Sequence, residues 1–306
     1  MKKIVILKHG GGELANQLWN YVSIYAYSLE CGAKITNASF FEYHYYFKFI
    51  NKEGITTKFF SCWFKSAVSR RSSLRNRFWR NTYIIYTGII KLFVGKNIIS
   101  SENKESQVVY LPPTSPLLFL ENKEKIYFIG WLFRNPVGLK KFRAEIISAF
   151  TPNEAMERKV NGIVRPLRQK YEKIVGVHVR QSDYSTFKGG AYFISQNRVK
   201  EIIGEFMVND SIDKDKILFL ITSDGRIDEK IFRDINTYIS KENAITDLFL
   251  LSSTDTVIGS DSSFGAFAAW YGNVPHIVMT KNPIDWSYYA GKKEYFENQY
   301  SNMVHY

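Results

Sequence analysis

Short apolar runs alternate with helical repeats of apolar positions from the start of the chain. The run Ile4–Leu7 ends in three glycines, residues 10–12, and apolar residues then recur at helical spacing over residues 14–29. Gly32 is typical of a helix end, and Ala33–Thr36 can begin a second strand. This order of strand, glycine turn, helix and strand predicts the start of an α/β domain.

The second half of the chain shows the same alternation more clearly. Strands are predicted at Ile174–Val179, Ile217–Thr222, Thr256–Gly259 and His276–Thr280. Helices are predicted from a cap at Ser195 through Phe206, and at Asp228–Ile235, Thr246–Ser253 and Ser262–Tyr271. Such alternation favours a parallel sheet with helices on both faces.

Both halves together predict the α/β class, with two Rossmann-like domains that face a cleft. We place the first domain at residues 1–152 and the second at residues 153–306, because Thr151-Pro152-Asn153 interrupts the pattern. The length of 306 residues accommodates two domains of about 150 residues each. We expect the last roughly 30 residues to be able to pack back across the boundary.

Composition narrows the class of protein without deciding it. With 45% hydrophobic and 23% charged residues, the chain is typical of a globular protein and unlike a disordered one. The net charge of +12 favours an anionic partner: nucleic acid, acidic lipid or a phosphorylated small molecule. Two cysteines, Cys31 and Cys62, are too few for a disulfide framework. Together with an N-terminus that lacks a signal peptide, they favour a cytoplasmic setting.

Residues 65–80 form the most basic segment of the chain, with six cations and few apolar positions. One interpretation is a solvated helix face or loop. The other is a basic face that lies on anionic lipid at the inner side of a membrane, supported by Phe78, Trp79 and the apolar run Tyr83–Val94. That run is too short to cross a bilayer.

Polar side chains follow three of the predicted strands at the point where each strand ends. They are His178, Arg180 and Asp183 after the first strand, Ser223 and Asp224 after the second, and Ser260-Asp261-Ser262-Ser263 after the third. In open α/β sheets, ligands bind beyond the carboxyl ends of the strands. The sequence therefore predicts a binding site at this edge of the second sheet.

The residue types at that edge suit a nucleoside diphosphate. Arg180 offers permanently charged donors to phosphate oxygens, and Ser262 and Ser263 offer hydroxyl and N–H groups at a helix N-terminus. Asp247, near the start of a helix, either accepts hydrogen bonds from a purine or caps the helix. His178 is either a buried core histidine or a ligand-binding one.

Four segments of the chain resemble motifs of one enzyme family. They are GELANQLWNY at residues 12–21, YFIGWL at residues 127–132, HVRQSDY at residues 178–184, and DLFLLSSTDTVIGSDSSFGAFAAW at residues 247–270. In this order they resemble the bacterial-type α-1,2-fucosyltransferases, which are inverting, GDP-fucose-dependent and GT-B-like. Residues 38–125 match none of the family's motifs.

The resemblance implies a glycosyltransferase that needs neither a metal nor a cofactor, with GDP-fucose as donor substrate. The acceptor would be a carbohydrate, free or lipid-linked, the product an α-1,2 linkage on a surface glycan, and nucleic acid would not be a partner. Donor contacts are expected from His178, Arg180, Ser223, Asp224, Asp247, Ser262, Ser263 and Phe264. Acceptor-side contacts are expected from Gly12, Asn16 and Gln17, and catalytic roles from Arg180, Asp183, Asn16 and Glu13.

The chain departs from the family pattern at several positions. Gln181 stands where the family's H-V-R-R-G-D-Y motif has a second arginine, so one cation beside the diphosphate is missing. Glu13 and Ala15 replace glycines of the first motif. An inverting displacement needs a general base within reach of the acceptor hydroxyl, and both Asp183 and Glu13 are candidates.

Three alternatives remain open from the sequence. Asp213-Lys214-Asp215 matches the Asp-x-Asp pattern of metal-dependent transferases that use another nucleotide sugar, although it precedes a strand. The charge of +12 also permits a nucleic-acid-binding protein, although no helix-turn-helix, zinc or RNA-binding motif is present. The loss of the second arginine permits a transferase-like module that binds without catalysis.

Overall fold

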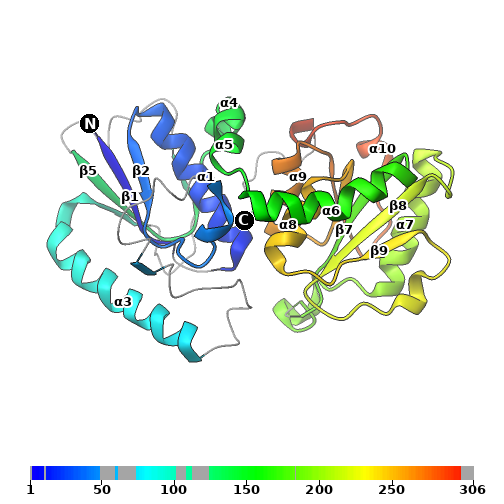
Figure 1. Ribbon diagram of the computed structural model, residues 1–306, viewed down its shortest axis with the longest axis horizontal. Helices are drawn as coiled ribbons and strands as arrows, with labels where there is room; N and C mark the ends of the chain where they lie inside the picture. The colour runs from blue at the N-terminus through cyan, green and yellow to red at the C-terminus, as the bar shows by residue number, and fades with distance from the viewer. Residues whose placement is uncertain are drawn as a thin grey trace. The chain divides into compact units, whose positions relative to one another are not determined.

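The structure is a computed structural model that describes residues 2–9, 12–48, 59–60, 74–100, 108–111, 124–182 and 184–297 (Figure 1). The chain divides into two compact units, with the boundary between Glu154 and Ala155. Each unit is described by itself below.

The first unit is built on a parallel sheet with the strand order β2-β1-β5-β3 in its described part. The strands are β1 (Lys3–Lys8), β2 (Lys34–Asn37), β3 (Ile98–Ser100) and β5 (Lys125–Ile129). The helices are α1 (Leu14–Glu30), α3 (Leu74–Val94), α4 (Pro136–Lys141) and α5 (Arg143–Ala149). A parallel pair, β4 (Val109–Tyr110) and β6 (Phe133–Arg134), completes it. The predicted strand and helix at the start of the chain are confirmed. Of the predicted glycine turn between them, residues 10 and 11 lie outside the described residues.

The buried side chain of Asn20 joins α1 to the segment after β5. Asn20 donates from Nδ2 to the carbonyl of Gly130 over 3.1 Å, and the N–H of Phe133 donates to its Oδ1 over 3.3 Å. Both Asn20 and Phe133 are buried. The first two motifs of the sequence are therefore in direct contact, and the YFIGWL segment helps to fix the position of α1.

The second unit contains a five-stranded parallel sheet with the order β11-β10-β7-β8-β9 in its described part. The strands are β7 (Lys173–Val179), β8 (Ile217–Ser223), β9 (Thr237–Ile239), β10 (Thr256–Gly259) and β11 (His276–Val278). When β7 is counted as the first strand, this is the 3-2-1-4-5 order of a Rossmann-type sheet. The strand order reverses between β7 and β10, because β8 and β9 are added on one side of β7 and β10 and β11 on the other.

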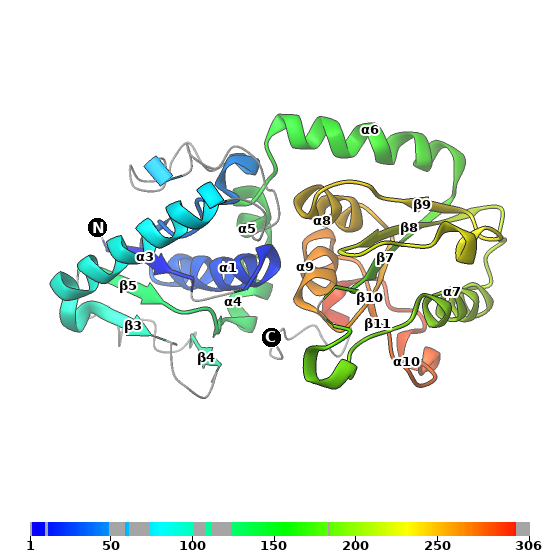
Figure 2. The same cartoon turned by 90° about the horizontal axis from the view of Figure 1, so that it is seen from below.

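Helices cover both faces of this second sheet, as predicted. They are α6 (Glu154–Lys170), α7 (Gln196–Asp210), α8 (Ala244–Ser252), α9 (Ser263–Gly272) and α10 (Trp286–Tyr289). In Figure 2 the strands lie between α7 on one side and α8 and α9 on the other. Val175, Val177 and Ile221 pack with Ile202 and Phe206 of α7 in one buried cluster. The predicted cap is confirmed, because the Ser195 side chain accepts a hydrogen bond from the N–H of Arg198.

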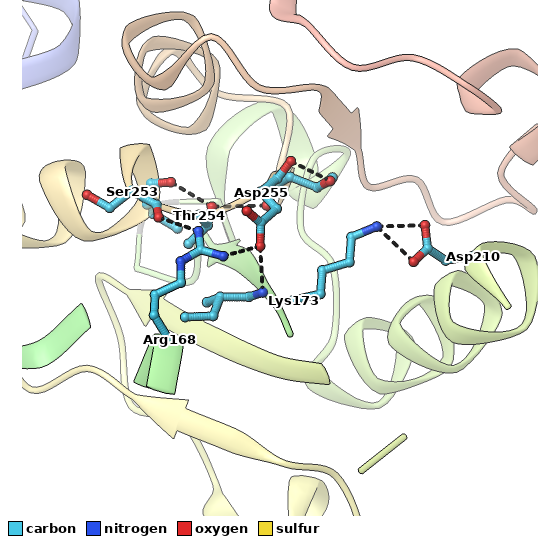
Figure 3. Close-up of polar contacts among 9 residues, drawn as sticks. Arg168, Lys173, Asp210, Ser253, Thr254 and Asp255 are labelled. Atoms are coloured by element: carbon cyan, nitrogen blue, oxygen red, sulfur yellow. Dashed lines mark hydrogen bonds and ion pairs between the residues drawn. The ribbon is translucent and has the colours of Figure 1, made fainter. Parts of the chain in front are cut away.

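Polar contacts hold α6 at the amino-terminal edge of the sheet (Figure 3). Arg168 forms an ion pair with Asp255 and donates to the carbonyl of Ser253 over 2.8 Å. Lys173, the first residue of β7, pairs with Asp210 at the end of α7 over 2.7 Å. These ion pairs lie at the edge opposite to the strand ends that carry His178 and Arg180.

One prediction for the second unit changes in detail. The helix predicted at Asp228–Ile235 is only a 3-10 turn, Glu229–Phe232, because the Asp228 side chain and carbonyl accept from nearby N–H groups and hold a tight turn. The chain then adds β9, which the sequence pattern did not predict. In the C-terminal segment, Ile284, Trp286 and Tyr289 contact the core of the second unit. Residues 298–306 lie outside the described residues, and the packing of this segment across the boundary stays a prediction.

Of the basic segment 65–80, residues 65–73 lie outside the described residues, and residues 74–80 begin α3. This helix also contains the apolar run that follows the segment. None of the helices in the described part of the chain combines the length and apolar character that crossing a bilayer requires.

Candidate functional site

The carboxyl ends of β7 and β10 lie side by side where the strand order reverses. The two ends are joined by Ser260, whose Oγ accepts from the N–H of Arg180 over 3.0 Å and whose N–H donates to the carbonyl of His178 over 3.0 Å. Open α/β sheets bind their ligands at this crossing point. The fold therefore brings these two polar strand ends together, and the third, at the end of β8, joins them through the contact of Asp224 with Arg180.

Arg180 is held in a defined orientation at this edge. Its Nε lies 3.1 Å from Oδ2 of Asp224, and its guanidinium lies 5.6 Å from the centre of the Tyr184 ring. The Tyr184 hydroxyl donates to the carbonyl of Asp261 over 2.8 Å, so the ring is itself anchored to the segment after β10. With its side chain 24% exposed, Arg180 can still meet a ligand.

Asp224, at the end of β8, organises the loop that follows β7. Its Oδ1 accepts the N–H groups of Gln181 and Ser182 over 2.7 and 3.2 Å, and its Oδ2 accepts the Ser182 hydroxyl over 2.5 Å. Partial burial would raise the pKa of Asp224, but these hydrogen bonds and the charge of Arg180 hold it below its ordinary value. Asp224 therefore stays ionised and positions Arg180, and a direct donor contact by Asp224 remains a prediction.

Two neighbouring residues, the predicted Ser223 and the departure Gln181, also bind protein groups. Gln181, at the position of the missing arginine, donates from Nε2 to the carbonyl of Ile194 over 3.2 Å. Ser223 accepts from the N–H of Gly225 over 3.1 Å and so shapes the turn after β8. Both contacts stabilise the strand-end loops.

The N-terminus of α9 forms the other side of the site. The helix begins at Ser263 with Ser262 as its N-cap residue, close to the prediction. Ser262 makes no side-chain hydrogen bond to the helix backbone; its hydroxyl lies 3.4 Å from Nδ1 of His178 instead. The first N–H groups of a helix lack acceptors within the helix, and the helix dipole favours an anion there. This end of α9 is therefore suited to phosphate oxygens.

His178 is a buried, neutral histidine beneath this helix end. It is 3% exposed, and its ring stacks on that of Phe264 with 4.7 Å between the ring centres. Burial, with a smaller contribution from the charge of Arg180, lowers the pKa of His178 to about 4. The ring contacts the first turn of α9, and its contact with a purine remains a prediction.

A second buried histidine, His276 at the start of β11, was missed by the sequence analysis. It is fully buried, and burial followed by the influence of His178 lowers its pKa to about 3. A Cβ atom at Gly265 would lie 3.2 Å from Nε2 of His276 and 3.6 Å from Nδ1 of His178. Both rings thus lie against the first turn of α9. No motif marks His276, because its neighbours depend on the pairing of β11 with β10.

Asp247 lies beyond the carboxyl ends of β8 and β9. It is 6% exposed, and its Oδ1 accepts the hydroxyl of Ser240 over 2.5 Å. Burial raises the pKa of Asp247 to about 7, against the lowering effect of the Ser240 hydrogen bond. The alternative that Asp247 caps the helix is wrong, because Asn243 is the cap and accepts from the N–H of Thr246.

The predicted residues of the first unit gather at the N-terminus of α1. Gly12 has a positive φ of 78°, and a Cβ at this position would lie 2.5 Å from Cβ of Asn16, so only glycine fits. Gln17 is buried and donates to the carbonyl of Gly12 over 3.4 Å. Glu13 is exposed, and its carboxylate accepts from the Tyr43 hydroxyl over 3.4 Å. Asp183, the other candidate base, lies outside the described residues.

The Asp-x-Asp pair of the metal-dependent alternative lies elsewhere. Asp213 accepts from the N–H of Asp215 over 3.0 Å in the turn that immediately precedes β8. This is the amino-terminal edge of the sheet, opposite to Arg180. The pair cannot therefore act together with the groups at the carboxyl ends of β7 and β10.

The fold is similar to that of solved fucosyltransferases. The crystal structure of POFUT1 in complex with GDP-fucose matches with a TM-score of 0.56 and 13% identity, over 91% of this chain and 97% of that one. A mutant of Arabidopsis thaliana FUT1 in complex with GDP matches with a TM-score of 0.54 and 14% identity, over 92% of this chain and 71% of that one. No protein-family model and no curated protein matches the sequence. The predicted fold class, α/β and GT-B-like, is confirmed.

Proposed function

We propose that this protein transfers fucose from GDP-fucose to a sugar hydroxyl with inversion, without a metal or cofactor. One observation carries the proposal. Arg180 is fixed beside the N-terminus of α9 at the crossing point of the second sheet. This is the arrangement that a nucleoside diphosphate requires. The proposal is supported by the likeness of the whole chain to POFUT1, whose crystal structure holds GDP-fucose.

The chemical demand on such a site is stabilisation of the departing diphosphate. Negative charge grows on its oxygens as the bond to fucose breaks, and preorganised donors lower that barrier. In our proposal Arg180 supplies a permanent charge whose orientation Asp224 and Tyr184 have already fixed. The first turn of α9, with Ser262 and Ser263, supplies N–H and hydroxyl donors. Little reorganisation is then needed as the reaction proceeds.

The remaining residues of the proposal bind guanine, bind the acceptor sugar and remove the proton of its hydroxyl. The Asp247 carboxylate accepts from the ring N–H and the exocyclic amine of guanine, and Asn16 and Gln17 contact the acceptor sugar. Either Glu13 or Asp183 removes the proton of the acceptor hydroxyl. The α-1,2 linkage and a glycan or lipid-linked acceptor are supported by the resemblance of the HVRQSDY and DLFLLSS segments to bacterial-type enzymes.

The central test is the turnover of GDP-fucose with a panel of sugar acceptors. Arg180→Ala is expected to lower kcat/KM at least about 100-fold, because one preorganised charge donor is lost. The control is Arg226→Ala, which removes an exposed cation two residues after Asp224 and is expected to retain wild-type turnover. Wild-type activity is expected to survive EDTA, and NMR of the product is expected to show inversion at the anomeric carbon.

Three outcomes would count against the proposal. Near-normal turnover by a folded Arg180→Ala variant would remove Arg180 from the mechanism. Loss of activity in EDTA that returns with a divalent cation would favour a metal-dependent transferase. Binding of GDP-fucose without turnover on any acceptor of the panel would favour a binding module.

A further inference from the structure

Helix α3 is attached to the first unit through one of its faces. Trp79 and Tyr83 pack against the buried cluster that contains Phe41. Arg80 forms two hydrogen bonds of 2.8 Å with the carboxylate of Glu42, which is 7% exposed. These contacts fix the rotation of α3 about its own axis, and they therefore decide which side chains face outward.

The outward face of α3 is apolar apart from Asn81, which is also exposed. Its exposed large side chains are Phe78 (62%), Ile84 (55%), Ile85 (65%), Ile89 (50%), Leu92 (83%) and Phe93 (83%). From residue 84 to residue 93 the exposed positions are these residues and Gly88, so the outer stripe there carries no polar side chain. A surface helix ordinarily presents its polar face to water. An apolar stripe of this extent marks an interaction surface.

The sequence that contains and flanks α3 is cationic. Residues 54–101 contain nine lysines and arginines and not one aspartate or glutamate. Within the described part, Arg77 is exposed at the start of the stripe and Lys91 lies in the last turn of α3. Arg80 does not contribute to this charge, because Glu42 neutralises it. The occupant of the surface therefore has to be both apolar and anionic.

We propose that the outer face of α3, from Phe78 to Phe93, docks this protein in the interface of an anionic lipid bilayer. The apolar stripe enters the boundary between headgroups and acyl chains, and the flanking cations meet the lipid phosphates. An interfacial helix combines an apolar face with nearby cations in this way. The proposal stands apart from the transferase function, and its test needs no turnover.

The test is flotation of the full-length protein with phosphatidylcholine vesicles that contain or lack phosphatidylglycerol. Binding is expected only with the anionic lipid and is expected to weaken as salt increases. The double variant Leu92→Ser, Phe93→Ser is expected to lower the partition coefficient at least about tenfold, because two inserted side chains are lost. The matched control is Val208→Ser on α7, which is 78% exposed and is expected to bind as the wild type does.

A further variant tests how much the cations contribute to vesicle binding. Arg77→Gln is expected to lower the partition coefficient about fivefold, the effect of one cation near an anionic surface. Because Leu92 and Phe93 are more than four-fifths exposed, the double variant is expected to keep the wild-type melting temperature.

Three results would overturn the proposal: no binding to anionic vesicles, equal binding by the double variant, or a concentration-dependent dimer in the ultracentrifuge that the double variant abolishes. The last result would assign the stripe to a second copy of this chain.

Discussion

Asp247 is the side chain whose ionisation bears most directly on the proposed donor site. Burial raises the pKa of Asp247 well above its ordinary range, to about 7, so the unliganded group is largely protonated below neutral pH. A carboxylate that accepts two hydrogen bonds from guanine has to be ionised. At low pH, donor binding therefore requires Asp247 to lose a proton. The free-energy cost of this deprotonation disappears as the pH rises through 7.

We expect the affinity for GDP-fucose to rise about tenfold between pH 6 and pH 8, as Asp247 ionises. Calorimetry with GDP-fucose is suitable because its diphosphate diester keeps the same charge over this range. His178, with a pKa of about 4, does not titrate there. Asp247→Asn is expected to bind weakly and with a flat pH profile. If the affinity of the wild type did not change with pH, Asp247 would not bind guanine.

The sequence identified the donor-binding candidates at the residue scale but not how they support one another. Arg180 and Ser262 stand at strand and helix ends in the sequence pattern, so their position at the site could be predicted. The contact of Asp224 with the N–H groups of Gln181 and Ser182 joins residues 43 and 42 positions apart. Such a contact cannot be predicted from the spacing of residues along the chain.

At the scale of elements, the proposed site depends on the close packing of α8 and α9. Gly272 ends α9, and a Cβ atom there would lie 2.3 Å from the carbonyl oxygen of Ser252 at the end of α8. Because that atom belongs to the backbone, the helices would have to move apart. The same pair of helices carries Asp247 and Ser262, so their spacing affects both ends of the proposed donor.

Gly272→Ala is therefore expected to lower the free energy of unfolding by about 1–3 kcal/mol. Gly204→Ala is the matched control, because Gly204 lies inside α7 and a Cβ atom there has no neighbour within 4 Å. It is expected to raise the free energy of unfolding by about 0.5–1 kcal/mol. Urea unfolding measures both, and equal effects of the two substitutions would show that the helices tolerate the added methyl group.

The long apolar strands could be predicted from the sequence and the short irregular elements could not. The strands β7 and β8 are buried along almost their whole length, which produces unbroken apolar runs. In contrast, β9 has three half-buried residues and exists because Thr237 pairs with Phe219 of β8. Its neighbouring strand, and not its own composition, makes it a strand.

At the scale of the whole molecule, the division into two units has a direct consequence. All the predicted donor contacts lie in the second unit, which has its own sheet and buried core. The ion pair of Arg168 with Asp255 also fastens α6, its first helix, to that sheet. The second unit therefore contains the contacts expected of an independently folding domain.

A fragment of residues 153–306 is expected to unfold cooperatively and to be stabilised by GDP-fucose in a thermal-shift assay, because a ligand of the folded state raises its apparent stability. The same fragment with Arg180→Ala is expected to show no such stabilisation. A folded fragment that GDP-fucose does not stabilise would place essential donor contacts in the first unit. An unfolded fragment would show that the second unit depends on the first.

The sequence by itself determined the alternation of strands and helices, the polar groups at the strand ends and the resemblance to a transferase family. The alternation and the strand ends follow from local spacing, because apolar periodicity decides which face of an element is buried. The resemblance rests on the residues of the four motifs. Only the tertiary structure decided that β10 lies beside β7, so that the segment at Ser260 meets Arg180 from 80 positions away. It also decided which face of α3 meets water, because the contacts of Tyr83 and Arg80 with the first unit set that helix's rotation.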